Sequence, residues 1–236
     1  MMIHEKPVAI ITGAGSGIGR AVAKRLSTRG PVVLVGRRAD PLKETGSMLG
    51  TEGEDWIAVP ADIDAAEDRE RIIERTIDTF GRLDYLINNA GLGTCAPLGE
   101  LSERQIADLI SVNLTAPILL TRLALPHLLD RGGCVVSIGS RSAEDPFPGL
   151  GVYGCAKAGL EGLARCIANE YGDQGIRAYT IHPGAVETAM LRSIVDEETL
   201  PGDMVLGPDD IAAQVERFVL GQHDEPSGSA VVVAKN

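Results

Sequence analysis

The sequence predicts an α/β protein built on a doubly wound, parallel β-sheet. Seven short apolar segments without polar alternation are spread along the 236 residues, and stretches with helical periodicity separate them. Strands buried on both faces have this continuous apolar character, and a helix between successive strands is what a parallel connection requires. The alternation shows no break in composition, no repeat and no long linker, so we expect one domain over residues 1–236.

The first expected strand, residues 8–11, leads into a glycine-rich turn and then a helix over residues 18–26. The turn reads Thr12-Gly13-Ala14-Gly15-Ser16-Gly17-Ile18-Gly19, which has the spacing T-G-x-x-x-G-x-G and fits no register of G-x-G-x-x-G. A strand, a glycine turn and a helix in this order place free N–H groups at a helix N-terminus, where a dinucleotide pyrophosphate can bind. Taken alone, a glycine turn after a strand is also typical of an ordinary connection between a strand and a helix.

The later elements continue the alternation. The helix that begins at Asp64 has Glu67 three residues on, a relative of the capping box, and ends at Gly81. A long helical region begins with a capping box at Ser102 and is adjusted at Pro117. Strands are expected at 32–35, 56–59, 83–88, 134–138, 176–181 and 230–234, helices at 41–49, 64–80, 102–129, 152–171 and 209–220, and irregular chain at 183–207.

Composition argues against several classes of function. A net charge of −11 disfavours nucleic acid and anionic membrane surfaces. No apolar run approaches the ~18–20 residues of a membrane span, and residues 1–6 lead straight into the first strand without room for a signal peptide. The scattered histidines give no support to a metal site. The four cysteines, Cys95, Cys134, Cys155 and Cys166, are interpreted as small buried residues of a reduced, cytoplasmic protein.

Polar residues follow several strands, at the carboxyl edge where doubly wound sheets bind ligands. Arg37 and Arg38 follow the second strand, where an arginine suits a 2′-phosphate, although a solvated pair would look the same. Asp62 follows the third strand and could accept from an adenine amino group or cap a helix. The fourth strand ends in Asn-Asn-Ala-Gly at residues 88–91, which could let a sugar approach or form an ordinary turn.

Tyr153 and Lys157 form the strongest pair in the sequence. Their i, i+4 spacing puts both side chains on one face of a helix, one turn apart. A free phenol has a pKa of about 10, and a nearby ammonium can lower a pKa by roughly 1–3 units. The pair therefore predicts a tyrosine tuned towards general acid–base catalysis. An exposed tyrosine beside a solvated lysine would have the same spacing.

Together these motifs resemble the short-chain dehydrogenase/reductase family, over essentially the whole chain. The family's T-G-x-x-x-G-x-G, N-N-A-G and Y-x-x-x-K motifs are all present, in order. Further matches are Asn113, Ser140 thirteen positions before Tyr153, and Pro183-Gly184 after the sixth strand. The resemblance implies a Rossmann-like fold and an oxidoreductase that transfers hydride between a nicotinamide cofactor and a small carbonyl or alcohol substrate.

The resemblance also implies a role for each matching residue. Tyr153 would be the acid or base, Lys157 would lower its pKa and bond the nicotinamide ribose, and Ser140 would donate to the substrate oxygen. Asn113 would hold a water that links Lys157 to solvent, and Thr12 would tie the glycine turn to the fourth strand. The implied cofactor-binding residues are Gly13, Ser16, Gly17, Ile18, Gly19, Arg37, Arg38, Asp62, Ile63, Asn89, Ala90, Gly91, Tyr153, Lys157, Pro183, Gly184, Val186 and Thr188.

Two departures from the family pattern bear on cofactor and assembly. Ser16 stands where members that prefer NADP often carry a basic residue, so the expected preference for NADP(H) over NAD(H) depends on Arg37, with Arg38 beside it. The chain also lacks the Asp-Gly-Gly that commonly joins a tetramer interface. Since helix 152–171 is expected to pair with the helix that carries Asn113 across a two-fold axis, we expect a homodimer or homotetramer.

The substrate is the least determined part of the sequence. The expected pocket walls are residues 92–98, 141–152 and 189–206, with a substrate loop at about 185–207, and they mix polar and apolar side chains. A 3-oxoacyl-carrier-protein reductase is an alternative, although it would need a basic docking patch. A non-catalytic dinucleotide-binding sensor or scaffold is an alternative of another class, but such a protein would normally have lost the tyrosine, lysine or serine.

Overall fold

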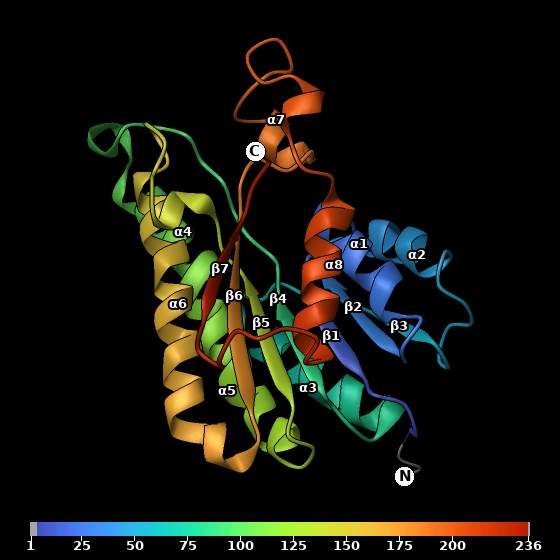
Figure 1. Ribbon diagram of the computed structural model, residues 1–236. Helices are drawn as coiled ribbons and strands as arrows, with labels where there is room; N and C mark the ends of the chain where they lie inside the picture. The colour runs from blue at the N-terminus through green and yellow to red at the C-terminus, as the bar shows by residue number, and fades with distance from the viewer. Residues whose placement is uncertain (1–3, 236) are drawn as a thin grey trace.

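The computed structural model describes residues 4–235, in which a seven-stranded parallel sheet lies between two layers of helices (Figure 1). The strand order is β3-β2-β1-β4-β5-β6-β7, which confirms the expected doubly wound fold. The strands are β1 (Ala9–Thr12), β2 (Val32–Gly36), β3 (Trp56–Pro60), β4 (Tyr85–Asn88), β5 (Cys134–Ile138), β6 (Arg177–Pro183) and β7 (Ala230–Val233). The helices are α1 (Gly17–Leu26), α2 (Ala39–Gly46), α3 (Ala66–Phe80), α4 (Glu103–Ile110), α5 (Ala116–Leu129), α6 (Gly151–Tyr171), α7 (Ala189–Arg192) and α8 (Pro208–Val219).

The continuous apolar strands are explained by two cores, one on each face of the sheet. Along β1, Ala9 and Ile11 belong to the core under α1, α2 and α8, whereas Ile10 belongs to the core under α3, α5 and α6. Successive strand side chains point to opposite faces, so a strand covered on both sides needs an apolar residue at every position. Figure 1 shows the two helical layers on either side of the sheet.

The strand order reverses between β1 and β4, which places a crevice at the centre of the sheet. β1 pairs in parallel with β2 on one side and with β4 on the other, so Ile11 lies opposite both Leu34 and Ile87. The chain leaves β1 and β4 towards opposite faces, and ligands of doubly wound folds bind beyond the carboxyl ends at this position. The segment with α7 lies above the same edge (Figure 1).

The start of α3 differs from the sequence expectation. Its N-cap is Ala65, which offers no side-chain cap, so Asp64 does not form the expected capping-box relative. The Asp64 carboxylate instead accepts a hydrogen bond from the Ser111 hydroxyl, a partner from a distant segment that sequence spacing does not reveal. Asp68 accepts from the Asp62 backbone N–H, and this bond holds the pKa of Asp68 below its ordinary value. The helix ends at Gly81 as predicted, with φ of 72°.

The long helical region over residues 103–129 is one continuous but irregular rod. Ser102 and Gln105 form the predicted capping box, and residues 111–115 form a π-helical turn just before Pro117. An 18-residue window of this region reaches a mean hydropathy of 1.5, which meets the length and composition of a membrane span, contrary to the expectation that no run approached one. A core helix meets the same criterion, and Leu120 and Leu128 of α5 are buried against the sheet.

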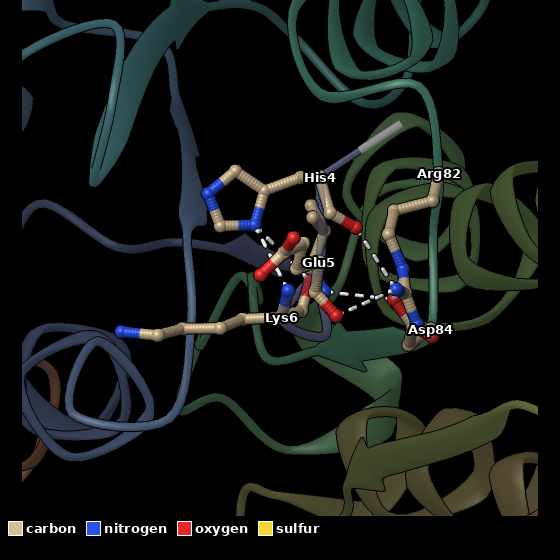
Figure 2. Close-up of polar contacts among 6 residues, drawn as sticks. His4, Glu5, Lys6, Arg82 and Asp84 are labelled. Carbon is tan, nitrogen blue, oxygen red and sulfur yellow. Dashed lines mark hydrogen bonds and ion pairs between the residues drawn. The ribbon is translucent and has the colours of Figure 1, made fainter. Parts of the chain in front are cut away.

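An ion pair fastens the N-terminal segment beneath the sheet (Figure 2). The Arg82 guanidinium bonds both oxygens of Asp84 at 2.6 and 2.8 Å and donates to the carbonyls of His4 and Glu5. The Asp84 carboxylate also accepts from the Val8 backbone N–H at 2.8 Å. Asp84 is 6% exposed, so the pair is largely removed from water and replaces its hydration with these five protein hydrogen bonds. The sequence predicts that residues 1–6 leave no room for a signal peptide. Residues 1–3 of this segment lie outside the described residues.

The expectation of four buried cysteines is wrong for three of them. Only Cys134, inside β5, is buried, and burial raises the pKa of its thiol to about 12. Cys95, Cys155 and Cys166 are free and exposed. Cys155 and Cys166 lie on the side of α6 that faces away from the sheet. The rotation of the helix about its axis places them there, whatever their residue type.

Candidate active site

The glycine turn is fastened to the end of β4 by Thr12. The Thr12 hydroxyl accepts from the backbone N–H groups of Asn89 and Ala90, both at 2.9 Å, and donates to the Ile87 carbonyl. The Asn89 side-chain amide returns a hydrogen bond to the Thr12 carbonyl at 2.7 Å. These bonds hold the two strand ends on either side of the crevice in one fixed geometry, as the sequence predicts for Thr12 and Asn89.

The turn between β1 and α1 forms a cradle that side chains would fill. A Cβ on Gly19 would collide with the Gly13 carbonyl oxygen, and a Cβ on Gly17 would lie 3.1 Å from the Thr188 methyl group. Ser16, the N-cap of α1, makes no side-chain cap hydrogen bond, so the first-turn N–H groups of α1 are not taken up by their own cap. An anionic diphosphate fits donors of this kind at a helix N-terminus. Thr188, from beyond β6, closes the cradle.

Thr45 and Arg20, which the sequence did not indicate as site residues, bind two carbonyl groups of the glycine turn. The Thr45 hydroxyl donates to the Ala14 carbonyl at 3.0 Å, and the Arg20 guanidinium donates to the Gly15 carbonyl at 2.6 Å. Arg20 also bonds the Thr45 hydroxyl, so α1 and α2 brace the turn together. Thr45 is fully buried in the structure, and neither its position nor that of Arg20 in the sequence indicates this contact.

The residues expected near the adenosine end follow β2 and β3. Arg37 and Arg38 are exposed directly after β2, and among residues 4–235 neither makes an ion pair. Asp62 is half-buried, and its carboxylate accepts from the Asp64 N–H, so it does not cap α3. Ile63 is buried, and its carbonyl accepts from Arg69 at 2.6 Å.

Ser140 and Tyr153 are brought together at the carboxyl end of β5. Ser140 lies two residues beyond the strand, where its Oγ accepts from the Ser142 N–H at 3.1 Å. Tyr153 is in the first turn of α6, and the Ser140 hydroxyl lies near enough to its phenol to lower the pKa of that phenol. The Ser142 bond occupies an Oγ lone pair and leaves the hydroxyl hydrogen free to point at the phenol.

Lys157 is buried one helical turn below Tyr153, with 2% of its surface exposed. Its Nζ donates to the Ile138 carbonyl at 2.8 Å and lies 5.6 Å from the centroid of the Tyr153 ring. A Cβ on Gly91 would lie 3.5 Å from this Nζ and 2.9 Å from Asn113 Oδ1. The absence of a side chain at Gly91 therefore keeps a space between the Lys157 ammonium and the Asn113 amide.

Asn113 lies in the π-helical turn, and its side chain is fully engaged. Its amide nitrogen donates to the carbonyls of Leu92 and Leu109, and its Oδ1 accepts from the Leu92 N–H at 3.1 Å. Its backbone carbonyl is in a different situation, because the residue four positions on is Pro117, which has no N–H to donate. The Asn113 carbonyl therefore lacks the i+4 backbone donor of an ordinary α-helix.

The expected lowering of the Tyr153 pKa is wrong for this structure. Burial raises the pKa of Tyr153 to about 12, and only the nearby Ser140 hydroxyl opposes this rise. Burial also lowers the pKa of Lys157 to about 8. The ammonium bonds the Ile138 carbonyl instead of the phenol, so desolvation outweighs its attraction for a phenolate.

The segment after β6 reaches across the crevice to the end of β4. Met190 Cγ and Ile194 Cδ1 would lie 3.2 and 3.5 Å from a Cβ on Gly93. Met190 Cε would lie 3.9 Å from one on Gly91, next to Lys157. The expected walls at 92–98 and 189–206 are therefore in contact. Gly184 and Val186 are fixed by backbone pairing with Val233 and Leu206, and Pro183 ends β6. Other apolar members of the expected walls, Leu98, Phe147 and Met204, are more than half exposed.

Comparison with known proteins gives consistent matches over most of the chain. The family model for short chain dehydrogenases matches residues 7–199. An uncharacterized oxidoreductase of Thermotoga maritima is 34% identical over 206 residues, which are 86% of this chain and 81% of that protein. The structure of 3-ketoacyl-(acyl-carrier-protein) reductase from Brucella melitensis complexed with NADH has a TM-score of 0.89 at 29% identity, over 98% of both chains. A short chain dehydrogenase from Burkholderia cenocepacia in complex with NADP has a TM-score of 0.88 at 29% identity, over 98% of this chain and 97% of that one.

A glycine turn at the switch point of a doubly wound sheet defines a dinucleotide-binding class of α/β protein. Within that class, the chain belongs to the short-chain dehydrogenase family. It is an oxidoreductase of that family, with the Rossmann-like fold that the sequence predicts.

Proposed function

We propose that this protein transfers hydride between a nicotinamide dinucleotide and a small carbonyl or alcohol substrate, with Tyr153 as the acid or base. The observation that carries the proposal is the placement of Tyr153 near the Ser140 hydroxyl, with Lys157 buried one helical turn below and 5.6 Å from the centroid of the Tyr153 ring. The glycine turn fits a dinucleotide, because Ser16 leaves the first-turn N–H groups of α1 without a side-chain cap and these groups can bind a diphosphate. When bound, the nicotinamide supplies or accepts the hydride.

The protein's own groups bind, orient and move the proton. The cradle between β1 and α1 would hold the pyrophosphate, and Lys157 with the end of β4 would hold the nicotinamide ribose. Ser140 would donate to the substrate oxygen and keep it within reach of the Tyr153 phenol. A water on the Asn113 carbonyl would return protons towards Lys157 from solvent, which Pro117 supports because it offers that carbonyl no i+4 N–H.

Carbonyl reduction is the direction that we propose at neutral pH. With a pKa of about 12, Tyr153 keeps its proton well above pH 7. A protonated phenol is the form that donates to a carbonyl oxygen, whereas alcohol oxidation needs the phenolate. The same burial that prevents the expected lowering of the pKa therefore suits the acid role.

The replacement Tyr153→Phe tests the proton transfer. It removes the hydroxyl and keeps the ring, so turnover of ketones should fall by about 10²–10⁴-fold. Cofactor affinity, measured by titration of the nicotinamide dinucleotide, should change little. Tyr171→Phe is the matched control, because it makes the same change at the last residue of the same helix. A Tyr153→Phe enzyme with near-normal turnover on its substrate would overturn the assignment.

We also propose a preference for NADP(H) over NAD(H). Arg37 is exposed beyond β2 without an ionic partner among residues 4–235, and Gly36 presents no acid to repel a phosphate. A charge-assisted contact contributes about 1.5–3 kcal/mol, or roughly a ten- to hundred-fold preference. The relatives named above carry NADH in one structure and NADP in the other.

The replacement Arg37→Asp tests this preference. The ratio of kcat/KM with NADPH to that with NADH should fall by at least ten-fold, because the carboxylate repels a 2′-phosphate and can bond ribose hydroxyls. Arg75→Asp makes the same charge change on the exposed side of α3 and should leave the ratio unchanged. Equal efficiency of the wild type with both cofactors would refute the preference.

A small substrate with an apolar group next to its carbonyl fits the cover over the crevice. Met190 and Ile194 contact the glycines after β4 and leave an apolar surface beside Lys157. A 3-oxoacyl thioester is the second candidate, favoured by the likeness to the Brucella melitensis reductase. A panel of simple ketones, alcohols and an acetoacetyl thioester, followed at the absorbance of the reduced nicotinamide, separates the two. We propose a cytoplasmic homodimer or homotetramer as the working form.

A further inference from the structure

His182 is a buried imidazole that the steps above do not use. It is the sixth residue of β6 and has no exposed surface. Its Nδ1 accepts from the Ser140 backbone N–H at 3.0 Å, and its Nε2 lies 3.0 Å from a carboxylate oxygen of Glu161. Both ring nitrogens therefore have partners, which a polar group at this depth requires.

The two partners determine where the imidazole carries its proton. A backbone N–H can only donate, so Nδ1 must present a lone pair to Ser140. The ring is then neutral with its hydrogen on Nε2, and Nε2 donates to Glu161. A proton on Nδ1 would face the Ser140 N–H and break that bond.

The fold leaves room for this ring only beside a glycine. A Cβ on Gly139 would collide with His182 Nδ1 and lie 2.6 Å from its Cε1. The imidazole therefore packs flat on the backbone that leads from β5 into Ser140. The imidazole contacts Gly139 and accepts a hydrogen bond from Ser140. These two contacts together fix the path of the backbone as it leaves β5.

Glu161 connects this arrangement to the helix of Tyr153. Tyr153, Lys157 and Glu161 follow one another at intervals of four on α6 and so lie along one side of it. The other Glu161 oxygen pairs with Arg165 at 3.3 Å, one turn further on. The helix thus carries the phenol directly and anchors Ser140 through Glu161 and His182.

We propose that His182, oriented by Glu161, is a positioning residue that sets the Ser140 hydroxyl against the Tyr153 phenol. The Ser140 backbone is held by His182 and its Oγ by the Ser142 N–H, which turns the hydroxyl hydrogen away from Ser142. This inference rests on the proposed role of Ser140 in the reaction.

The replacements His182→Leu and His182→Asn test the proposal as a near-isosteric pair. An asparagine can place its Oδ1 where Nδ1 stands and accept from Ser140, whereas leucine cannot. We expect kcat to fall by about 10–10²-fold for His182→Leu, with the cofactor Kd unchanged, because a displacement near 1 Å has an effect of this size. His182→Asn should recover most of that loss. Equal losses for the two variants would overturn the proposal.

A double-mutant cycle with Ser140→Ala separates this inference from the proposed function. If His182 acts through the Ser140 hydroxyl, His182→Leu should lower kcat by less than about two-fold once that hydroxyl is gone. An unchanged multiplicative loss would overturn the positioning role while leaving Ser140 in place. A Ser140→Ala enzyme with full turnover would instead overturn the role proposed for Ser140.

If His182→Leu does not fold, variants of Glu161 test the same proposal, because Glu161 is a half-exposed residue of α6. Glu161→Gln retains an oxygen that can accept from Nε2, and Glu161→Leu does not. Nitrogen-15 spectra of the wild type and Glu161→Gln should show one neutral tautomer of His182 with its hydrogen on Nε2. Glu161→Leu leaves the Nε2 hydrogen without an acceptor in a buried site, so the imidazole should lose its fixed position and kcat should fall. Full turnover in Glu161→Leu would contradict the proposal.

Discussion

The buried ammonium of Lys157 should destabilise the free protein while serving its function. Lys157 is 2% exposed, and burial lowers its pKa from 10.5 to about 8. At 1.36 kcal/mol per pH unit, this gap corresponds to about 3 kcal/mol at neutral pH. The replacement Lys157→Met keeps a side chain of similar length and removes the charge, so it removes this penalty.

The expected gain in stability is smaller than the full penalty. Lys157→Met also removes the hydrogen bond to the Ile138 carbonyl, and an unpaired buried acceptor costs about 1–3 kcal/mol. At pH 7 the variant should therefore be more stable than the wild type by up to about 2 kcal/mol. For a chain of this size, each kcal/mol raises Tm by about 2–4 °C.

The dependence on pH identifies the cause. The unfolded lysine binds its proton more tightly than the folded one, so the wild type gains stability relative to Lys157→Met as pH rises through 8 towards 10.5. By linkage, the advantage of the variant should shrink by about 2 kcal/mol between pH 7 and pH 9.5. Groups common to both proteins, such as Cys134, cancel in this difference.

Urea unfolding of both proteins at several pH values measures the effect, with the exposed Lys24→Met as control. The control should show no pH-dependent difference from the wild type. Turnover and cofactor affinity of Lys157→Met should both fall, since the charge and a ribose contact are lost. A stability difference that is independent of pH, or a variant less stable than the wild type at pH 7, would refute the reasoning.

Three further outcomes are expected. Gly91→Ala should lower turnover by at least ten-fold, since its methyl group would lie 2.9 Å from Asn113 Oδ1, whereas Gly99→Ala meets no atom within 4 Å and should leave turnover unchanged. Asp84→Leu should lower the urea-measured free energy of unfolding by about 3 kcal/mol or more, because it leaves the Arg82 charge buried and unpaired; an unchanged midpoint would contradict this. Light scattering at micromolar concentration should show at least a dimer, and a species of only ~25 kDa would refute the predicted assembly.

Most of the fold was predictable because its signals are local. Continuous apolar runs identified all seven strands, and β5 begins and ends where the sequence predicts. The capping box at Ser102 and the stop at Gly81 also need only neighbouring residues. The cap predicted at Asp64 is wrong, because the hydroxyl that Asp64 binds comes from Ser111, 47 residues away.

The sequence by itself determined the family, the order of the elements and the residues proposed for the chemistry, since spacing in the chain carries all three. Only the tertiary structure decided the environments of those residues. It placed Lys157 against a carbonyl and raised the pKa of Tyr153 by burial, and it brought His182 from β6 to the backbone of Ser140. The physical reason is that desolvation and buried hydrogen bonds depend on what surrounds a group in space, and segments far apart in the chain supply those surroundings.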